Sequence, residues 1–587
     1  MTPDWLGLPR WQILDTSFKD GRGFLSTWHI WQHTTDRSRM LHVVALCPRA
    51  PTSETLLQAC DGDASLLPLA HELIGHWFGL LPGFHRFLLA HGQVTLTLCI
   101  GDALQALRQH TFLADEVCVA LDAADQPGAF DAHNPWAIKA LARCCRRGAL
   151  LRGHLPAGAD ASTLSQLLRA SGFTISDTRT DTDRQLQARF DPPWTLKTSR
   201  QNHLTALPVQ RCAVVGAGLA GASVAAALAR RGWQVLVLDA APTPAAGASG
   251  LPVGLVVPHT SSDDCPLSRL SRAGVRLTLQ QARQHLQPGT QWAASGVLER
   301  QVGGTPQLPS HWSPEGLDWS VSAPDKLADG PGLWHPQAAW IQPAALVSAW
   351  LKQPGVRFQG GAKVCHLQHT NGVWQLLDET QRVLCCAERV VFANAGAARP
   401  LLDSLAQSHP ALSSQLQRLP STQGMRGLLS WALHSDSTVD QAAFPPFPVN
   451  GFSGLVPHVP TDQGPAWFMG STYQPEQQVE RPDANNHVRN WEHLKELLPS
   501  LAGPLAASFA ADTLQTWKGT RCISADRLPL VGPLDAGEQP SLWLCAALGS
   551  RGLSFSVLCA ELLAAQMGAE PLPVEAKLAK ALHALRA

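Results

Sequence analysis

The feature that most constrains the fold is a strand–turn–helix–strand segment that begins at Arg211. In "RCAVVGAGLAGASVAAALARRGWQVLVLDAAP" an apolar run leads into Gly216, Gly218 and Gly221, which form a G-x-G-x-x-G pattern. The first glycine permits a tight turn, the second lets a phosphate approach the backbone, and the third lets the helix pack close to the strand. Asp239 ends the second strand, 23 residues after Gly216, where an acid can bind ribose hydroxyls. The segment predicts a dinucleotide-binding Rossmann unit, and the alternative is a glycine-rich turn without a ligand.

The length and composition set wider limits. A chain of 587 residues is too long for one hydrophobic core, so we expect at least two domains. The formal net charge of zero argues against extensive non-specific binding of nucleic acid but allows a local basic patch. The N-terminal "MTPDWLGLPRW" lacks the pattern of a signal peptide, and the apolar run 217–229 is too short to cross a bilayer. With 14 cysteines and no C-x-x-C spacing, we expect reduced thiols and a cytoplasmic protein with no membrane segment.

The N-terminal part of the chain has a different pattern. From residue 10 to 190, strand-like and helix-like segments alternate, which predicts a parallel, doubly wound α/β sheet. The segments "GFTISDTRT" and "RQLQARF" predict a hairpin that closes this sheet. Strands are expected at 12–15, 41–46, 94–100, 117–121 and 149–152, and helices at 65–76, 102–109, 135–146 and 161–171.

A polar segment with three prolines separates the two patterns. We expect residues 1–190 to form a Rossmann-like domain and 191–210 to form a linker. Residues 211–587 are expected to form a second domain. Within it, the dinucleotide-binding unit is followed by a mixed α+β part, rich in Trp and Pro, that lies mainly within 265–515.

Two later segments indicate which dinucleotide binds. "GASGLPVG" follows the ribose acid directly and contains Ser249 and Gly250. "LGSRGL", with Gly549, Arg551 and Gly552, begins an apolar helix near the C-terminus. A glycine-rich turn at a helix start can point N–H groups at a flavin pyrimidine ring, where they stabilise negative charge. An NAD site would not need the chain to return there, so FAD is the expected cofactor.

These motifs, together with "VVFANAG" around Asn394, resemble the D-amino-acid-oxidase group of FAD-dependent amine oxidoreductases. The resemblance implies that the Asn394 turn lies against the FAD, which we expect to be bound non-covalently because no motif marks a flavin-linking His or Cys. A narrower resemblance rests on "PLSRL" at 266–270, "ADRLPLVGPL" at 525–534 and "LGSRGLSFSVLCAELLAAQMGAEPLP" at 548–573. These segments resemble the bifunctional tRNA 5-methylaminomethyl-2-thiouridine biosynthesis proteins.

The narrower resemblance implies two activities on tRNA. The C-terminal half would use FAD to remove the carboxymethyl group from 5-carboxymethylaminomethyl-2-thiouridine at the wobble position, giving 5-aminomethyl-2-thiouridine. The N-terminal half would use S-adenosylmethionine (SAM) to methylate the exposed amine. The resemblance thus implies a Rossmann-like methyltransferase fold followed by a D-amino-acid-oxidase-like fold.

The N-terminal loop departs from the family's pattern. The family's "DTGFGTGLNF" is "DTSFKDGRGF" here, so that Ser17 and Lys19 replace two glycines and Arg22 follows the retained Gly21. The acid expected at the end of the second strand is Cys47. These changes predict a degraded methyltransferase site that binds little or no SAM.

A second departure follows the fourth predicted strand. Asp122 and the pair Asn134–Pro135 are kept, but the segment between them is longer and has lost the family's "GFAPAK". This loss also predicts an inactive methyltransferase. The alternative is a site remodelled around Asp15, Asp102 and Asp122 that still binds some SAM.

The oxidase half needs a group that holds the substrate carboxylate. A guanidinium suits a carboxylate best, as a bidentate fork. The candidates are Arg426 in "GMRG", Arg521 in "KGTRC" and Arg551 in "GSRG", and the sequence does not rank them. Tyr473, the only tyrosine, could donate a further hydrogen bond. Structural salt bridges are the alternative for each arginine.

The sequence also contains features typical of other functions. "HELIGH" at 71–76 lacks a second His four residues after the first, so no metal site is predicted. The basic segment 143–148 is expected to be a solvated helix end, or a contact for tRNA phosphate. The rival functions are a small-molecule amine or amino-acid oxidase and a non-catalytic RNA-binding scaffold. The sequence predicts no oligomeric state.

Overall fold

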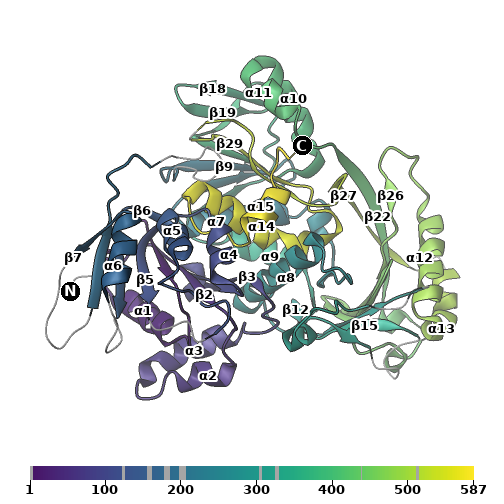
Figure 1. Cartoon of the computed structure of the whole chain (residues 1–587). Coiled ribbons are helices and arrows are strands. Elements are labelled where there is room, and N and C mark those ends of the chain that lie inside the picture. Colours follow the sequence, from purple (N-terminus) through teal and green to yellow (C-terminus); the bar gives the residue numbers. More distant parts are fainter. Residues whose placement is uncertain are drawn as a thin grey trace. The chain divides into compact units, whose positions relative to one another are not determined.

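The computed structural model shows two compact units (Figure 1). One consists of Met1–Val209, Arg230–Gly232 and Ala564–Lys580, and the other of Gln210–Ala229, Trp233–Leu563 and Ala581–Ala587. Ala564–Lys580 therefore groups with the N-terminal unit, whereas the sequence division places it in the second domain. Asp122 and residues 197–205 of the expected linker lie outside the described residues. The structure describes residues 4–121, 126–154, 161–176, 185–196, 206–302, 304, 307–323, 330–437, 439–510, 514–537 and 539–586.

The N-terminal unit is built on an eight-stranded sheet with the order β3-β4-β2-β1-β5-β6-β8-β7. Its five central strands are parallel, which confirms the Rossmann-like fold. The expected hairpin is the antiparallel pair β7 and β8. The strands are β1 (Arg10–Asp15), β2 (Met40–Cys47), β3 (Gly83–Leu89), β4 (Val94–Ile100), β5 (Ala114–Ala120), β6 (Cys145–His154), β7 (Phe173–Ser176) and β8 (Gln185–Phe190).

Alternating side chains on the central strands build a core on each face of this sheet. Leu14 and Val44 join one buried cluster, whereas their neighbours Ile13 and Val43 join the other. Strands that are apolar on both faces are typical of parallel sheets covered by helices. One face packs on α1 (Arg22–His33), α2 (Ser53–Gln58) and α3 (Leu67–Ile74), and the other on α4 (Ala103–Arg108), α5 (Pro135–Arg143) and α6 (Ala161–Ala170).

Several expected boundaries in this unit are wrong. The helix expected at 135–146 ends at Arg143, because Cys145 already begins β6. The basic segment 143–148 therefore runs from a helix into a strand and is not a helix end. β3 and α1 were not expected from the sequence. The glycines and charges of "KDGRGF" and the polar residues of "GFHRFLL" hide their periodicity.

The second unit contains a six-stranded sheet with the order β17-β10-β9-β21-β29-β28. All its pairs are parallel except β28 with β29. The strands are β9 (Arg211–Val215), β10 (Gln234–Leu238), β17 (Val356–Gln359), β21 (Arg389–Phe392), β28 (Leu530–Pro533) and β29 (Leu542–Ala546). The helices that follow β9 and β29 are α7 (Leu219–Arg230) and α14 (Gly552–Gly568).

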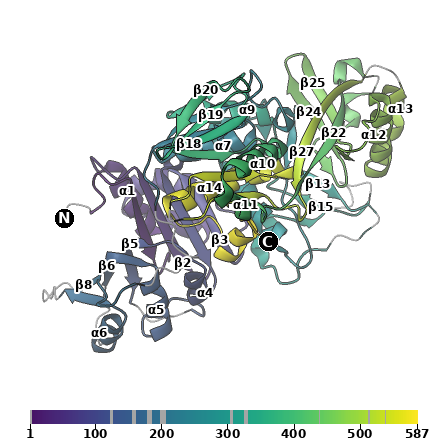
Figure 2. The same ribbon diagram turned by 90° about the horizontal axis from the view of Figure 1, so that it is seen from above.

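A nine-stranded sheet forms the other large part of this unit, and α12 and α13 lie along it (Figures 1 and 2). Its longest strands, β22 and β27, pair in antiparallel register over ten residues each. The elements are β13 (Val297–Arg300), β14 (Val321–Ser322), β15 (Gly332–His335), β22 (Thr422–Leu433), β23 (Val449–Asn450), β24 (Gly454–Thr461), β25 (Gly464–Gly470), β26 (Gln474–Pro475), β27 (Gln515–Ser524), α12 (Asp483–Leu497) and α13 (Pro499–Ala510).

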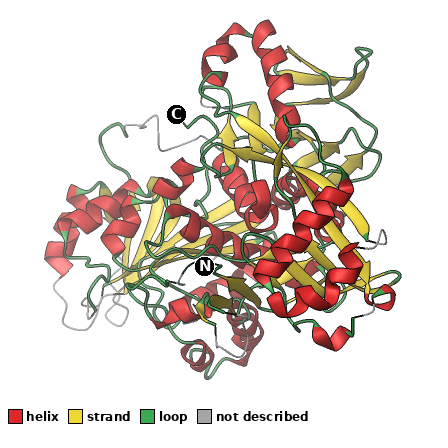
Figure 3. Cartoon of the chain, turned by 90° about the vertical axis from the view of Figure 1, so that its right-hand side faces the viewer, coloured by secondary structure: helices red, strands yellow, loops and turns green. Residues whose placement is uncertain are grey.

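Smaller elements complete the second unit (Figure 3). They include two three-stranded sheets. Over the described residues, no helix is long and apolar enough to cross a membrane. The elements are β11 (Gly254–Val256), β12 (Trp292–Ala293), β16 (Ala339–Ile341), β18 (His366–Thr370), β19 (Val373–Leu377), β20 (Val383–Ala387), α8 (Pro266–His285), α9 (Pro343–Leu351), α10 (Ala398–Ser408) and α11 (Pro410–Leu416). The short helix α15 (Ala576–Ala581) belongs to the N-terminal unit except for Ala581.

Candidate active site

Four parallel strands of the six-stranded sheet end at one cavity of about 740 Å³. β10 leads into Asp239, β9 into Gly216, β21 into Asn394, and β29 into Leu548, and all four residues line the cavity. Ligands of open α/β sheets bind at this edge because parallel strands bring their carboxyl ends together there. The remaining wall includes residues of β27.

The three glycines of the G-x-G-x-x-G pattern each meet a separate steric requirement. Gly216 has φ +108°, and a Cβ there would lie 2.6 Å from the Ala393 carbonyl oxygen. A Cβ on Gly221 would collide with the Gly216 carbonyl oxygen, so that this glycine sets the packing of α7 on the turn. Gly218 lines the cavity, and its Cβ would lie 2.9 Å from Ser249 Oγ. Because Gly218 lines the cavity and has no side chain, its backbone is open to a ligand.

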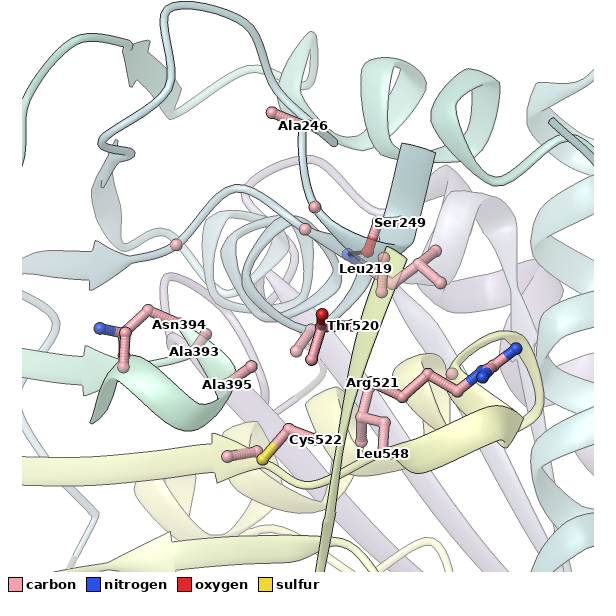
Figure 4. Close-up of a pocket in the computed structure, with 18 of the residues that line it drawn as sticks. Leu219, Ala246, Ser249, Ala393, Asn394, Ala395, Thr520, Arg521, Cys522 and Leu548 are labelled. Atoms are coloured by element: carbon pink, nitrogen blue, oxygen red, sulfur yellow. Dashed lines mark hydrogen bonds between the residues drawn. The ribbon is translucent and has the colours of Figure 1, made fainter. Parts of the chain in front are cut away.

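Two side chains fix this glycine turn in place. Ser249 Oγ accepts a hydrogen bond from the Leu219 N–H at 2.9 Å, at the start of α7 (Figure 4). The Asp239 carboxylate accepts from the N–H groups of Ala217, at 2.7 Å, and Ala241, at 2.8 Å. Ser249 and Asp239 both line the cavity. The Asp239 carboxylate, which the sequence predicts as a ribose ligand, thus also stabilises the turn.

The other predicted cofactor residues divide into two groups. Gly549, with φ +61°, and Gly552, at the start of α14, line the cavity. The first N–H groups of a helix have no partner within it, so they can face a negatively charged ring. Gly250 and Arg551 are not among the lining residues. A Cβ on Gly250 would lie 2.5 Å from the Ala245 carbonyl oxygen, so this glycine serves the turn.

Asn394 lines the cavity, and its side chain has an unused acceptor. Its Oδ1 is buried and has no hydrogen-bond partner within the part of the chain that the structure describes. Buried polar atoms are almost always paired, so an orphaned acceptor fits a ligand with a donor group. An exposed backbone at Gly218, a helix start, a carboxylate and this amide together fit a flavin dinucleotide.

The structure separates the arginines that the sequence leaves unranked. Arg521, on β27, lines the cavity, whereas Arg426 and Arg551 do not. Arg426 donates from Nη1 to the Gln478 carbonyl oxygen at 2.9 Å. Tyr473 is 47% exposed and is also absent from the lining, but its ring lies 5.8 Å from Arg521 Cζ. In Figure 4 the Arg521 side chain extends away from Asn394.

The guanidinium of Arg521 is only partly satisfied by the protein. Nη2 donates to Ser471 Oγ, whereas Nη1 is buried without a partner among the described residues. Burial lowers the pKa of Arg521, and Tyr473 acts in the opposite direction. A buried cation with a free N–H group is a ready site for a carboxylate.

The N-terminal loop keeps a glycine-like backbone conformation at a position where the glycine itself is lost. Lys19 has φ +50°, a backbone conformation that favours glycine. The Arg22 side chain donates from Nη1 to the carbonyl oxygens of Ala59, at 2.5 Å, and Asp61, at 3.1 Å. Burial raises the pKa of Asp15 to about 7, although the Ser17 N–H and Lys19 act in the opposite direction.

Cys47 offers no charge to a ribose at the end of β2. Its Sγ donates to the Arg49 carbonyl oxygen at 2.7 Å, and burial raises its thiol pKa to about 11. Asp102, another residue of the alternative remodelled site, caps α4 by accepting from the Gln105 N–H at 2.7 Å. Asn134 likewise caps α5 by accepting from the Trp136 N–H. The side chains of Cys47, Asp102 and Asn134 thus each form a hydrogen bond that stabilises the local fold.

Comparison with known proteins agrees with the two-part architecture. The family described as FAD dependent oxidoreductase matches residues 211–566. The tRNA 5-methylaminomethyl-2-thiouridine biosynthesis bifunctional protein MnmC of Albidiferax ferrireducens is 48% identical over 99% of this chain and 94% of its own length. The protein of the same name from Polaromonas sp. is 43% identical over 99% of this chain and 91% of its own length. The chain belongs to this bifunctional family.

The family assignment confirms several expectations from the sequence. The resemblance, the FAD-dependent oxidoreductase fold and FAD as the cofactor are all confirmed.

Among solved structures, glycine oxidase from Geobacillus kaustophilus is 18% identical and covers 64% of this chain and 99% of its own, with a TM-score of 0.48. Amadoriase I from Aspergillus fumigatus is 18% identical over 62% of this chain and 88% of its own, with a TM-score of 0.45.

No local sequence pattern points to Gly427, a further residue of the site. Gly427 on β22 pairs with Gly519 on β27. A Cβ on Gly427 would lie 2.5 Å from Arg521 Nη1. The "GMRG" segment drew attention to Arg426, but its second glycine is what makes room for the guanidinium. A glycine within a strand often marks such a close approach.

Within the described residues, no group of three or more His, Cys, Asp or Glu side chains could hold a metal ion. In "HELIGH", α3 ends at Ile74 and Gly75 caps it, so His76 lies beyond the helix.

Proposed function

We propose that the chain uses FAD to remove the carboxymethyl group from 5-carboxymethylaminomethyl-2-thiouridine at the wobble position of tRNA. The relative of Albidiferax ferrireducens, 48% identical over nearly the whole chain, carries this proposal. The intact cavity supports it, because Gly216, Gly218, Asp239 and Asn394 all lie at the carboxyl edge of the sheet. Because the proposed substrate is tRNA, the proposed location of the protein is the cytoplasm.

The chemistry assigns a role to each part of the cavity. When bound, FAD supplies an acceptor for the two electrons lost by the substrate's CH–NH bond. Loss of two electrons and two protons converts N–CH₂–COO⁻ to N=CH–COO⁻. Addition of water then yields the aminomethyl uridine and glyoxylate. Arg521 holds the substrate carboxylate through its free Nη1, and Tyr473 lies beside that guanidinium.

We further infer that the N-terminal unit transfers no methyl group. Lys19 places a side chain in the loop, and the Cys47 thiol replaces a carboxylate. The unit serves instead as a folded partner of the oxidoreductase, or as a surface for tRNA.

The test is a nucleoside analysis. The full-length protein is incubated with tRNA that bears 5-carboxymethylaminomethyl-2-thiouridine, and the digested nucleosides are identified by mass spectrometry. We expect 5-aminomethyl-2-thiouridine, with little methylaminomethyl product when SAM is added. Full conversion with SAM would contradict the inactive methyltransferase and leave the oxidase standing. Unchanged tRNA, together with rapid oxidation of free glycine, would favour a small-molecule oxidase.

A further inference from the structure

An indole and a guanidinium lie on the same face of β27 in the cavity wall. β27 pairs with β22 in a regular register, so that residues 517, 519 and 521 point to one side of the strand. Trp517, Gly519 and Arg521 all line the cavity. Figure 4 shows Arg521 extending away from Asn394. The face that carries Trp517 and Arg521 is therefore turned away from this cofactor residue.

Two paired glycines bring the indole and the guanidinium close to each other. Gly519 lies directly opposite Gly427 on β22. A Cβ on Gly519 would lie 2.4 Å from Cη2 of Trp517, so the outer edge of the indole covers this glycine. The Arg521 guanidinium covers Gly427 in the same way. Because the Cβ positions of directly paired residues are about 5 Å apart, the indole edge and the guanidinium lie no more than about 10 Å apart.

The indole of Trp517 is held in place from its other side. Leu429 lies opposite Trp517 on β22 and belongs to a buried cluster with Val253 and Phe468. Trp517 packs against this cluster but is itself only partly buried. An aromatic ring that is fixed by a core on one side and lines a cavity on the other presents a rigid, flat surface to a ligand.

The proposed substrate has a flat ring and a carboxylate at a matching separation. In 5-carboxymethylaminomethyl-2-thiouridine, four bonds join the carboxylate carbon to the pyrimidine ring. Bonds of about 1.5 Å give this link a length of about 5 Å when it is extended. A ligand whose carboxylate pairs with Arg521 can therefore place its ring against Trp517.

We propose that the base of the modified uridine stacks on Trp517 while Arg521 binds the carboxylate. This inference rests on the proposed function and adds the recognition of the base. The wobble uridine lies in the single-stranded anticodon loop, and proteins recognise unpaired RNA bases by stacking them on aromatic side chains. A free amino acid such as glycine has no ring to place there, so Trp517 favours the nucleotide over a small amine.

The test compares a substrate with a base and one without. tRNA that bears 5-carboxymethylaminomethyl-2-thiouridine has the base, whereas N-methylglycine has only the amine and the carboxylate. Each is added without oxygen to the full-length, FAD-loaded protein, and the second-order rate constant of flavin bleaching is measured. Trp517→Leu should lower this constant about tenfold or more for the tRNA, as expected for a lost stacking contact, and less than about twofold for N-methylglycine.

Three further variants separate stacking from packing. Trp517→Phe keeps an aromatic face, so its constant for the tRNA should stay within about threefold of the wild type. Trp431→Leu is the matched control, because Trp431 stacks on Phe468 and packs against the same cluster but is not among the described residues that line the cavity. It should change neither constant. If Trp517→Leu does not fold, Gly519→Ala displaces the edge of the indole and should give the same selective loss.

Several outcomes would overturn the proposal. Equal losses for the tRNA and N-methylglycine would mean that Trp517 only positions Arg521. Equal losses in Trp517→Phe and Trp517→Leu, or unchanged tRNA oxidation in Trp517→Leu, would also refute stacking. Loss of FAD from Trp517→Leu would make the indole a contact of the cofactor. Failure of the proposed function is separately visible, because the tRNA would then neither bleach the wild-type flavin nor be modified.

Discussion

Gly427 and Arg521 lie on the paired strands β22 and β27, so close that a Cβ on Gly427 would come within 2.5 Å of Arg521 Nη1. The atom that it would displace is the end of a flexible side chain and not the backbone. A methyl group at this position is therefore expected to move the guanidinium without unfolding the sheet. A substitution at Gly427 can therefore displace the Arg521 guanidinium while Arg521 itself is kept.

Gly427→Ala should lower kcat/KM for the modified tRNA about tenfold or more, because the carboxylate loses an aligned charged hydrogen bond. FAD content and the unfolding temperature should change little. Gly503→Ala is the matched control, since a Cβ there meets nothing within 4 Å. Steady-state kinetics with wild-type activity for Gly427→Ala would exclude Arg521 as the carboxylate ligand.

Gly218→Val should yield a purified protein without FAD. A branched side chain would fill the approach to the backbone, and even a Cβ would lie 2.9 Å from Ser249 Oγ. Gly218→Ala should lose less flavin, because the Ser249 hydroxyl can move. The absorbance of the bound flavin relative to protein measures both effects. A yellow Gly218→Val protein would place the dinucleotide elsewhere.

The sequence predicted the cofactor end of the cavity better than the substrate end. Gly216, Gly218 and Asp239 lie within one strand–turn–helix–strand unit, where local geometry dictates the residue type. Asn394 was found from the resemblance of "VVFANAG" to the oxidase group, and Gly549 from a glycine-rich turn that begins an apolar helix. In each of these cases the signal lies within one continuous segment of the chain.

The substrate end depends on contacts that are distant in sequence. Arg521 could not be ranked above Arg426 and Arg551 because its place in the cavity wall follows from the pairing of β27 with β22. No local pattern encodes that register. Gly427 was missed for the same reason, since it approaches Arg521 only through the pairing of these two strands.

Glu570→Gln tests a buried ion pair in the N-terminal unit. Arg231 Nε donates to Glu570 at 2.8 Å, and both side chains are less than 5% exposed. His42 Nε2 lies 3.5 Å from the same carboxylate. Removing the charge leaves Arg231 buried without its anion, so this unit should lose about 3–5 kcal/mol of unfolding free energy. Glu388→Gln, whose partner Arg211 is 55% exposed, should cost about 1 kcal/mol or less.

The effect of Glu570→Gln should depend on pH. Arg231 and His42 hold the pKa of Glu570 well below its usual range, despite burial. A carboxyl with a depressed folded pKa adds stability above its unfolded pKa of about 4.3, and this stability is lost as the pH falls. Burial also lowers the pKa of His42, so acid destabilises the unit further. Thermal unfolding of the variant and wild type should therefore differ most near pH 7 and converge in acid.

Lys19→Gly should stabilise the N-terminal unit by about 0.5–1 kcal/mol, because a non-glycine residue at φ +50° is strained. Lys19→Ala is the control, since it removes the side chain but keeps the Cβ, and it should give no gain. Calorimetry should detect no SAM binding to the wild type or to Lys19→Gly, since the Cys47 thiol still replaces the ribose acid. Micromolar binding by the wild type would show a remodelled site.

Asp15→Asn should stabilise the N-terminal unit at pH 8 and have little effect near pH 3. Burial raises the pKa of Asp15 to about 7, so the folded state holds a proton that the unfolded chain releases near pH 4. A raised carboxyl pKa lowers stability as the pH rises from about 4 to 7, and above 7 the full cost is present. Asparagine stays neutral and its Oδ1 can still accept from the Ser17 N–H, at 3.0 Å in the native loop. We expect a gain of about 1–3 kcal/mol at pH 8 by chemical denaturation. A loss at pH 8 would mean that a charged Asp15 is stabilised by a partner, as in a site that still binds a cation such as SAM.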